Sequence, residues 1–274
     1  IMGDWDMKAP LEKPARRHIT KIAVIGSGPA GLSCAWFLAQ MGYPVTVFEA
    51  MPLPGGMLRY GIPAYRLPDA IVAAHIARLE AMGIAFRCNT KIGEGADLSL
   101  SDLKRLGFKA VMLAPGTTVS RKVHMEGVEL PGVHWGLEFL RANRGDEQPR
   151  LSGDVLVIRV VDEQGRFAPL FDENATMRIR ADHIIFAIGQ ASELDGFAKD
   201  VRIEQGRIVI EDVTFSTSAW GIFAAGDAAT GPSSVVSAIA GGRECAFSID
   251  RMLKGADIRG ERERKRPELP EEQW

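Results

Sequence analysis

A glycine-rich loop between an apolar run and a helical pattern constrains the fold of this chain more than any other feature. Residues 26–31 read Gly-Ser-Gly-Pro-Ala-Gly and satisfy the pattern GxGxxG. The run 21–25 (KIAVI) before the loop has the apolar, β-branched character of a strand buried on both faces. After the loop, apolar residues recur at helical spacing as far as Ala39, and Pro29 suits a first helical turn. The loop therefore joins a buried strand to a helix.

A second strand completes a βαβ unit. Gly42 follows the helical pattern as a C-terminal cap, and residues 45–49 (VTVFE) form the next strand. A right-handed crossover and a parallel sheet follow from this unit. We therefore expect an α/β fold with a doubly wound, Rossmann-like domain.

The rest of the chain continues this pattern with one interruption. We expect helices at 69–82, 100–106 and 234–253, and strands at 85–88, 110–114, 183–188 and 221–225. From 155 to 184, short β-like runs are separated by Gln164-Gly165 and Asn174, which predicts a small antiparallel β-meander.

The first motif predicts a dinucleotide site. Its glycines permit a tight turn and close approach of the backbone to a pyrophosphate, and the helix N-terminus supplies N–H donors. Glu49 ends the second strand 18 residues after Gly31, where a carboxylate accepts hydrogen bonds from an adenosine ribose. The alternatives are a helix-packing turn without a ligand and an ordinary strand-end acid.

A second motif favours FAD over NAD. Gly226 and Asp227 follow a buried strand, so Asp227 can accept hydrogen bonds from a ribityl chain. Ser234 then opens the last helix, whose N-terminus would favour negative charge on a flavin. A Ser-capped helix without a ligand is the alternative here.

Composition excludes several classes of function. The net charge of -2 provides no basic field for nucleic acid. The three cysteines form no CxxC pair and the five histidines show no ligand spacing, so we expect neither a redox disulfide nor a metal site. No apolar run reaches the roughly 20 residues of a membrane-spanning helix. We expect a cytoplasmic protein.

The chain resembles the FAD-binding portion of the glutamate synthase small-subunit family, which includes relatives in dihydropyrimidine dehydrogenase and in electron-bifurcating ferredoxin:NADP oxidoreductases. The resemblance lies in residues 23–31 (AVIGSGPAG), 54–68 (PGGMLRYGIPAYRLP), 114–117 (APGT), 187–190 (AIGQ) and 221–243. It implies that Gly55, Gly56 and Met57 approach the flavin or ribityl region, that the backbone near Ile92 meets the adenine, and that residues 114–117 close over the dinucleotide.

These arguments together select twenty residues. The predicted cofactor-binding residues are Gly26, Gly28, Pro29, Ala30, Gly31, Glu49, Ala50, Gly55, Gly56, Met57, Arg59, Ile92, Ala114, Pro115, Gly116, Gly226, Asp227, Ser234, Val235 and Val236.

One departure from the family concerns NAD(P)H. Family members carry a second Rossmann domain, which begins with a strand followed by another glycine loop. Here Ile158 is followed by Arg159-Val160-Val161, which is not such a loop. We therefore divide the chain into a linker (1–20), a first part of the FAD domain (21–154), a β-meander left from a missing NAD(P)H domain (155–182), a second part of the FAD domain (183–258) and a tail (259–274).

The sequence thus predicts a flavin-dependent oxidoreductase module that carries electrons through FAD without a catalytic side chain. Alone, it should not be competent with NAD(P)H, and its partner would be an electron-transfer subunit or an iron-sulfur domain. The alternatives are a non-catalytic scaffold subunit with structural FAD and an FAD-dependent oxidase or hydroxylase acting on a small molecule.

Overall fold

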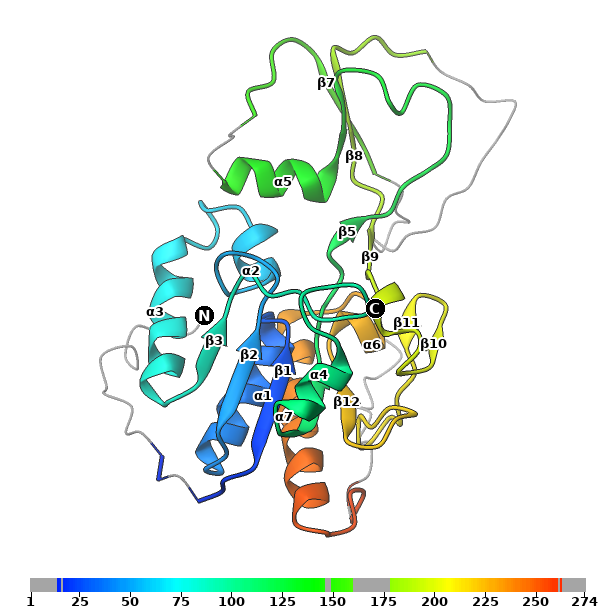
Figure 1. The fold of residues 1–274 in the computed structure, drawn as a ribbon. Coiled ribbons are helices and arrows are strands. Elements are labelled where there is room, and N and C mark those ends of the chain that lie inside the picture. Colours follow the sequence, from blue (N-terminus) through cyan, green and yellow to red (C-terminus); the bar gives the residue numbers. More distant parts are fainter. Residues whose placement is uncertain (1–13, 16, 146–148, 160–177, 261, 263–274) are drawn as a thin grey trace, which may run out of the picture.

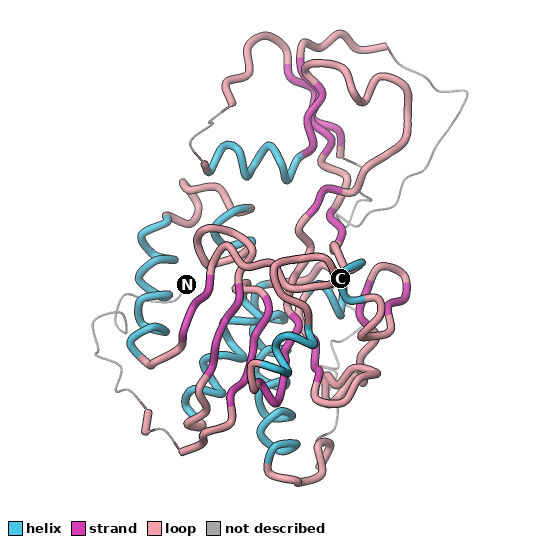
Figure 2. The backbone as a smooth tube through the Cα atoms, in the orientation of Figure 1, coloured by secondary structure: helices cyan, strands magenta, loops and turns pink. Residues whose placement is uncertain are grey.

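A computed structural model describes residues 14–15, 17–145, 149–159, 178–260 and 262 of the chain (Figure 1). It has a larger body built on a parallel sheet and a smaller body above it, as the tube in Figure 2 also shows. Among the described residues, no helix has both the length and the apolar character needed to cross a membrane.

The central sheet has the order β12-β4-β1-β2-β3, and all of its strands are parallel. Its strands are β1 (Lys21–Ile25), β2 (Val45–Phe48), β3 (Ala85–Arg87), β4 (Phe108–Leu113) and β12 (Ile222–Ala224). The strand order places β1 in the middle, so its carboxyl end lies at the centre of one sheet edge. This arrangement confirms the predicted α/β, Rossmann-like fold.

Helices cover both faces of the central sheet. Successive side chains of each strand point to opposite faces, so each strand contributes to both cores. Ile22 and Val24 of β1 pack into a core with α1 (Pro29–Gln40), α3 (Asp69–Ala81) and α7 (Val235–Leu253). Ala23 and Ile25 pack on the other face with α4 (Leu100–Arg105) and η1 (Asp195–Phe197). The sheet is therefore doubly wound, as expected from its near-continuous apolar strands.

The smaller body differs from the prediction. Its sheet has the order β6-β8-β7, and β7 (Val155–Ile158) and β6 (Val133–Trp135) both pair in parallel with β8 (His183–Phe186). Val155–Ile158 therefore does not begin an antiparallel meander, and His183–Phe186 does not join the central sheet. The remainder of the predicted meander falls largely on 160–177, outside the described residues.

The two bodies are connected by an antiparallel pair, β5 (Val119–Ser120) with β9 (Gln190–Ala191). A second antiparallel pair, β10 (Ile203–Glu204) with β11 (Arg207–Ile208), lies beside the short helix α6 (Asp227–Thr230). The smaller body also contains α5 (Gly136–Arg144), which contacts the short helix α2 (Met57–Tyr60) of the larger body (Figure 1).

Helices α1 and α7 cross at close range over the central sheet. A Cβ atom at Gly242 of α7 would overlap the carbonyl oxygen of Ala30 in α1. Ser33 of α1 donates a hydrogen bond to the carbonyl oxygen of Ile239, with an oxygen–oxygen distance of 2.7 Å. Gly242 therefore belongs to helix packing and not to a second phosphate-binding loop.

We predict that Gly242→Ala destabilises the protein by about 1–3 kcal/mol. Alanine gains about 1 kcal/mol of helix propensity over glycine, but the added methyl group meets rigid backbone and forces α1 and α7 apart. Chemical denaturation measures the difference. Gly241→Ala is the matched control, because its Cβ would meet only side chains, at 3.3 Å. Equal stability of the two variants would contradict the close crossing.

Candidate functional site

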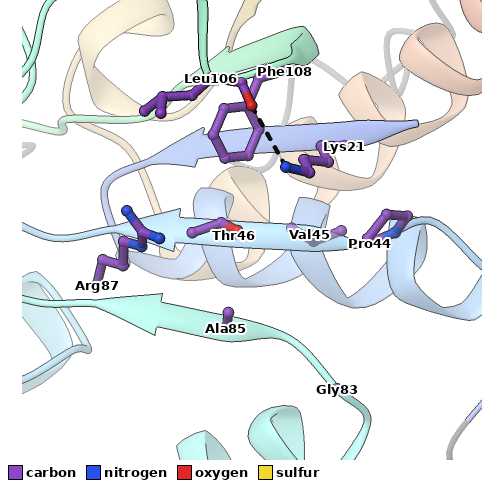
Figure 3. A pocket seen from close by; sticks show the side chains of 9 residues that line it. All are labelled: Lys21, Pro44, Val45, Thr46, Gly83, Ala85, Arg87, Leu106 and Phe108. Carbon is purple, nitrogen blue, oxygen red and sulfur yellow. Dashed lines mark hydrogen bonds between the residues drawn. The ribbon is translucent and has the colours of Figure 1, made fainter. Parts of the chain in front are cut away.

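A large cavity lies at the carboxyl ends of the central strands. Its volume is about 690 Å³, and Ile25, Phe48, Ala114 and Ala225 line it where β1, β2, β4 and β12 end. A smaller cavity of about 260 Å³ lies at the opposite, amino ends of the strands, beside Lys21 and residues on β2 and β3 (Figure 3). Because ligands of open parallel sheets bind at the carboxyl ends, the large cavity is the candidate site.

The three glycines of the first motif have different structural roles. Gly26 has φ +96°, and a Cβ there would overlap the carbonyl oxygen of Ala114. Gly31 lies against the carbonyl oxygen of Gly26, which leaves no room for a side chain. Gly28 borders the cavity, and nothing lies within 4 Å of the place where its Cβ would be. Gly26 and Gly31 thus shape the turn, and Gly28 leaves its backbone accessible from the cavity.

Glu49 is buried at the end of β2 and joins three segments around the cavity. One carboxylate oxygen accepts hydrogen bonds from the backbone N–H and the hydroxyl of Ser27. The other accepts from the backbone N–H of Met51 at 2.9 Å. The Ser27 hydroxyl oxygen in turn accepts from the backbone N–H of Gly55 at 2.8 Å. The first oxygen already accepts two hydrogen bonds, whereas the second accepts one and can accept another, so Glu49 still has capacity for a ligand hydroxyl.

Asp227 lies across the cavity in a second polar cluster. One carboxylate oxygen accepts from the backbone N–H and the hydroxyl of Ser233 at 3.2 and 3.3 Å. The other lies 3.5 Å from the Thr117 hydroxyl, which donates to the Gln190 side chain at 2.9 Å. Burial raises the pKa of Asp227 above its ordinary value, and the hydrogen bonds from Ser233 and the nearby polar hydroxyl of Thr117 oppose this shift. Asp227 is therefore a partly desolvated acceptor facing the cavity.

The N-terminus of α7 borders the same cavity. Ser234 caps the helix by accepting a hydrogen bond from the backbone N–H of Ser237 at 3.1 Å. Ser234 and Val235 line the cavity, and the positive end of the helix dipole lies there with them.

Most of the predicted residues come together in this cavity. Those that line it are Gly26, Gly28, Pro29, Ala30, Glu49, Ala50, Gly56, Met57, Ile92, Ala114, Pro115, Gly116, Gly226, Asp227, Ser234 and Val235.

Four predicted residues do not line the cavity: Gly31, Gly55, Arg59 and Val236. Gly31 packs against Gly26, and Gly55 packs against Val72 and Arg59. The Arg59 guanidinium is directed to the carbonyl oxygen of Pro54 at 2.8 Å and to Asp69 at 3.3 Å. Val236 is 74% exposed. Gly31, Gly55 and Arg59 therefore support the loops around the cavity, and Val236 faces solvent.

The structure also adds residues that the sequence did not single out. Ser27 comes from the loop after β1, Tyr60 from the end of α2, and Phe197 from η1. Arg141 comes from α5, in the smaller body. Ser27 lies within the GxGxxG motif, so a role for its hydroxyl in the turn could have been considered, whereas no sequence signal brings Arg141 to this place.

Two of the three cysteines lie in the packed interior, and Cys88 is partly buried. Cys34 and Cys245 are fully buried in α1 and α7, and burial raises the pKa of both thiols well above the ordinary value. Such thiols are poor nucleophiles because the thiolate is the reactive form. No group of three or more potential metal ligands occurs among the described residues.

Comparison with known proteins places this chain in a family. Residues 20–158 and 150–242 match the pyridine nucleotide-disulphide oxidoreductase family. The chain belongs to this family. Within it, the resemblance to the glutamate synthase small subunit is confirmed, because NADH glutamate synthase of Schizosaccharomyces pombe is 38% identical over 139 residues, which cover 51% of this chain and 6% of that enzyme. This member of the pyridine nucleotide-disulphide oxidoreductase family is a flavin-dependent oxidoreductase module.

Two further relatives cover more of the chain. Subunit β of NADP(+)-dependent formate dehydrogenase from Moorella thermoacetica is 31% identical over 315 residues, covering 85% of this chain and 44% of that subunit. Subunit PreT of NAD-dependent dihydropyrimidine dehydrogenase from Escherichia coli O157:H7 is 30% identical over 317 residues, covering 93% of this chain and 74% of PreT. The chain thus spans less than half of the formate dehydrogenase subunit.

The fold has a counterpart among solved structures. FprA from Mycobacterium tuberculosis, as its His57Gln mutant, superposes with a TM-score of 0.68 over 87% of this chain and 85% of FprA. The sequence identity is 13%, so this likeness establishes the fold alone.

We predict that Asp227→Asn stabilises the ligand-free protein at neutral pH. The folded state binds the carboxyl proton more tightly than the unfolded state, so the free energy of unfolding falls as pH rises from the ordinary carboxyl pKa through the raised one. Asparagine removes this ionisation and keeps an oxygen for Ser233. The gain should stay below about 1 kcal/mol, because Asp227 is only half-buried and solvent screens its charge.

Denaturation midpoints of both proteins over a pH series test this prediction. The difference should shrink as pH falls toward the ordinary carboxyl pKa. A variant that is less stable than the parent at neutral pH would show that the ionised Asp227 supports the fold.

Proposed function

We propose that the chain binds FAD in the large cavity and carries electrons through it. One observation supports this most directly: Gly28 and Glu49 from the first motif and Asp227 from the second line a single cavity, although nearly 180 residues of chain separate the motifs. A cofactor that reaches from the adenosine acceptor to the ribityl acceptor would account for both motifs at once. NAD would account for the first motif alone.

The residues present fit FAD at each of its parts. Glu49 would accept from the adenosine ribose, and the open backbone at Gly28 would let a pyrophosphate reach the first N–H groups of α1, which have no partner within the helix. Asp227 would accept from the ribityl chain. Met57 and the N-terminus of α7 would border the flavin ring.

The chemistry belongs to the cofactor: when bound, FAD accepts and donates electrons as a hydride or singly. The side chains of this protein bind and orient it, exclude water from its buried parts and set the charge around it. Neither an acid or base nor a nucleophile is assigned to the cavity.

We further propose that the segment 155–182, which begins with β7, is what remains of an NAD(P)H domain. The family matches meet at residues 150–158, next to the predicted junction at Ile158 and Arg159. The PreT alignment runs over 317 positions although only 93% of this 274-residue chain takes part, so PreT contains residues without a counterpart here. These observations support a missing domain with its junction near Ile158. The division into 21–154, 155–182 and 183–258, flanked by the linker 1–20 and the tail 259–274, remains our proposal for the sequence. The smaller body does not follow these bounds, because β6 and β8 pair in one sheet with β7.

A redox partner follows from this division. Without its own NAD(P)H domain, the bound FAD needs an electron donor and an acceptor from outside the described residues. Several relatives are subunits by name, which supports an electron-transfer subunit or an iron-sulfur domain as partner. The free cysteines support a reducing compartment such as the cytoplasm.

The first test is the identity of the cofactor. The purified protein should be yellow and release FAD, and not FMN, on heating, as resolved by chromatography. Glu49→Gln should weaken FAD binding by about 1–2 kcal/mol, because a charged acceptor becomes neutral and its amide cannot accept from Ser27 and the ribose together. FMN alone, or the absence of any flavin after attempted reconstitution, would overturn the proposed function.

The second test concerns NAD(P)H. Excess NADH or NADPH should leave the flavin absorbance near 450 nm unchanged for seconds under anaerobic conditions, whereas dithionite should bleach it. The reason is geometric, since hydride transfer needs the reacting atoms about 3–3.5 Å apart and a dedicated domain normally holds them there. Rapid bleaching by either nucleotide would contradict the proposal that this chain lacks a working NAD(P)H site. A flavin that also resists dithionite would favour a structural role for FAD.

A further inference from the structure

Arg141 is a cation in the cavity wall that the motifs do not explain. It belongs to α5 of the smaller body, yet it lines the cavity at the carboxyl edge of the central sheet. Its Nε atom is buried and has no hydrogen-bond partner in the part of the chain that the structure describes. A guanidinium remains charged and carries five N–H donors, so a buried donor without a partner is unfavourable unless a ligand accepts from it.

The position of Arg141 is fixed by its neighbour on the helix, Arg144. Residues three apart lie on the same side of a helix, so both arginines face the larger body. Arg144 donates hydrogen bonds to the carbonyl oxygens of Leu58, Arg59 and Leu67. It also pairs with Asp69 at 3.4 Å, and its side chain is only 5% exposed. These contacts hold α5 against α2, so Arg141 is held beside that helix.

The surroundings of α2 identify the part of the ligand that Arg141 would meet. Helix α2 begins at Met57, directly after Gly56, and a Cβ at Gly56 would lie 2.8 Å from the Cα of Gly28. The pyrophosphate subsite at Gly28 thus adjoins the start of α2, and Met57 and Leu58 line the cavity beyond it. Under the proposed function, that end of the cavity holds the flavin ring.

We propose that Arg141 is a positioning residue that donates hydrogen bonds to the polar edge of the flavin ring. This inference rests on the proposed binding of FAD. The ring offers carbonyl oxygens and nitrogens as acceptors, and it gains negative charge when two electrons and one proton are taken up. Arg141 therefore binds reduced FAD more tightly than oxidised FAD and raises the midpoint potential.

The experiment compares wild type, R141Q, R141K and R105Q. Glutamine favours a helix nearly as well as arginine, so α5 should remain folded in R141Q. R105Q makes the same substitution on α4, where Arg105 is exposed, pairs with Asp102 and lies outside the cavity. FAD affinity is measured by titration of the ligand-free proteins, and the midpoint potential by equilibration with reference dyes.

R141Q should bind oxidised FAD about tenfold or more weakly, as expected for a lost hydrogen bond to a charged group. Its midpoint potential should fall by about 30 mV, which corresponds to a further tenfold loss for reduced FAD in a two-electron couple. R105Q should match wild type, and R141K should keep most of the potential because it keeps the charge.

Wild-type affinity and potential in R141Q would overturn this inference while the proposed function stands, whereas wild type without FAD affinity would overturn the proposed function itself. If R141Q binds FAD more weakly at an unchanged midpoint potential, Arg141 contacts the pyrophosphate. That result would also overturn the proposed contact with the flavin ring. If R141Q does not fold, R141K provides the test. Lysine lacks the planar guanidinium that can donate two parallel hydrogen bonds, so R141K should bind FAD about threefold more weakly than wild type. Unchanged FAD binding in R141K would then overturn the proposed role of Arg141.

Discussion

The buried carboxylate of Glu49 is the interaction on which the rest of the cavity depends. Through Ser27 it fixes the turn between β1 and α1, and through the same hydroxyl it holds the loop that begins at Gly55. A buried charge is tolerated only when hydrogen bonds replace the lost water, and here backbone N–H groups and a hydroxyl supply them. One carboxylate therefore sets the relative positions of the segments that meet the adenosine and the flavin in our proposal.

Sequence reasoning predicted the larger body well because its signals are local. The loop glycines, the apolar strands and the position of Glu49 follow from chain geometry over a few dozen residues, and the spacing of Asp227 after a buried strand placed it at the same sheet edge. In the smaller body, β7 and β8 fall where strands were predicted, but their parallel pairing, β6 and α5 were not predicted. Its strand β6 has only three residues, α5 follows it without a side-chain cap, and β7 pairs with a strand far along the chain.

Side-chain direction accounts for the remaining differences. Arg59 and Arg141 are both basic residues on helices near the cavity, yet Arg59 is directed to Pro54 and Asp69, whereas Arg141 lines the cavity. The choice depends on the contact between Asp69 and Arg144, which lie 75 residues apart in the sequence and are brought together only by folding. Such a contact leaves no periodic signal in the sequence. Our sequence analysis therefore predicted a ligand-binding role for Arg59 and none for Arg141.

The antiparallel pair of β5 and β9 has a consequence for how such proteins can change. The chain leaves the larger body at Val119 and returns at Ala191, and these two residues are paired directly with each other. Whatever is inserted between them needs only to begin and end at neighbouring points, and the entropy of closing such a loop grows slowly with its length. The length of the segment beyond α5 is thereby uncoupled from the geometry of the cavity, whereas α5 itself is not, because its Arg141 lines the cavity. Structure distal to α5 can therefore be shortened or exchanged during evolution, or grafted there by design, while the cofactor site keeps its shape.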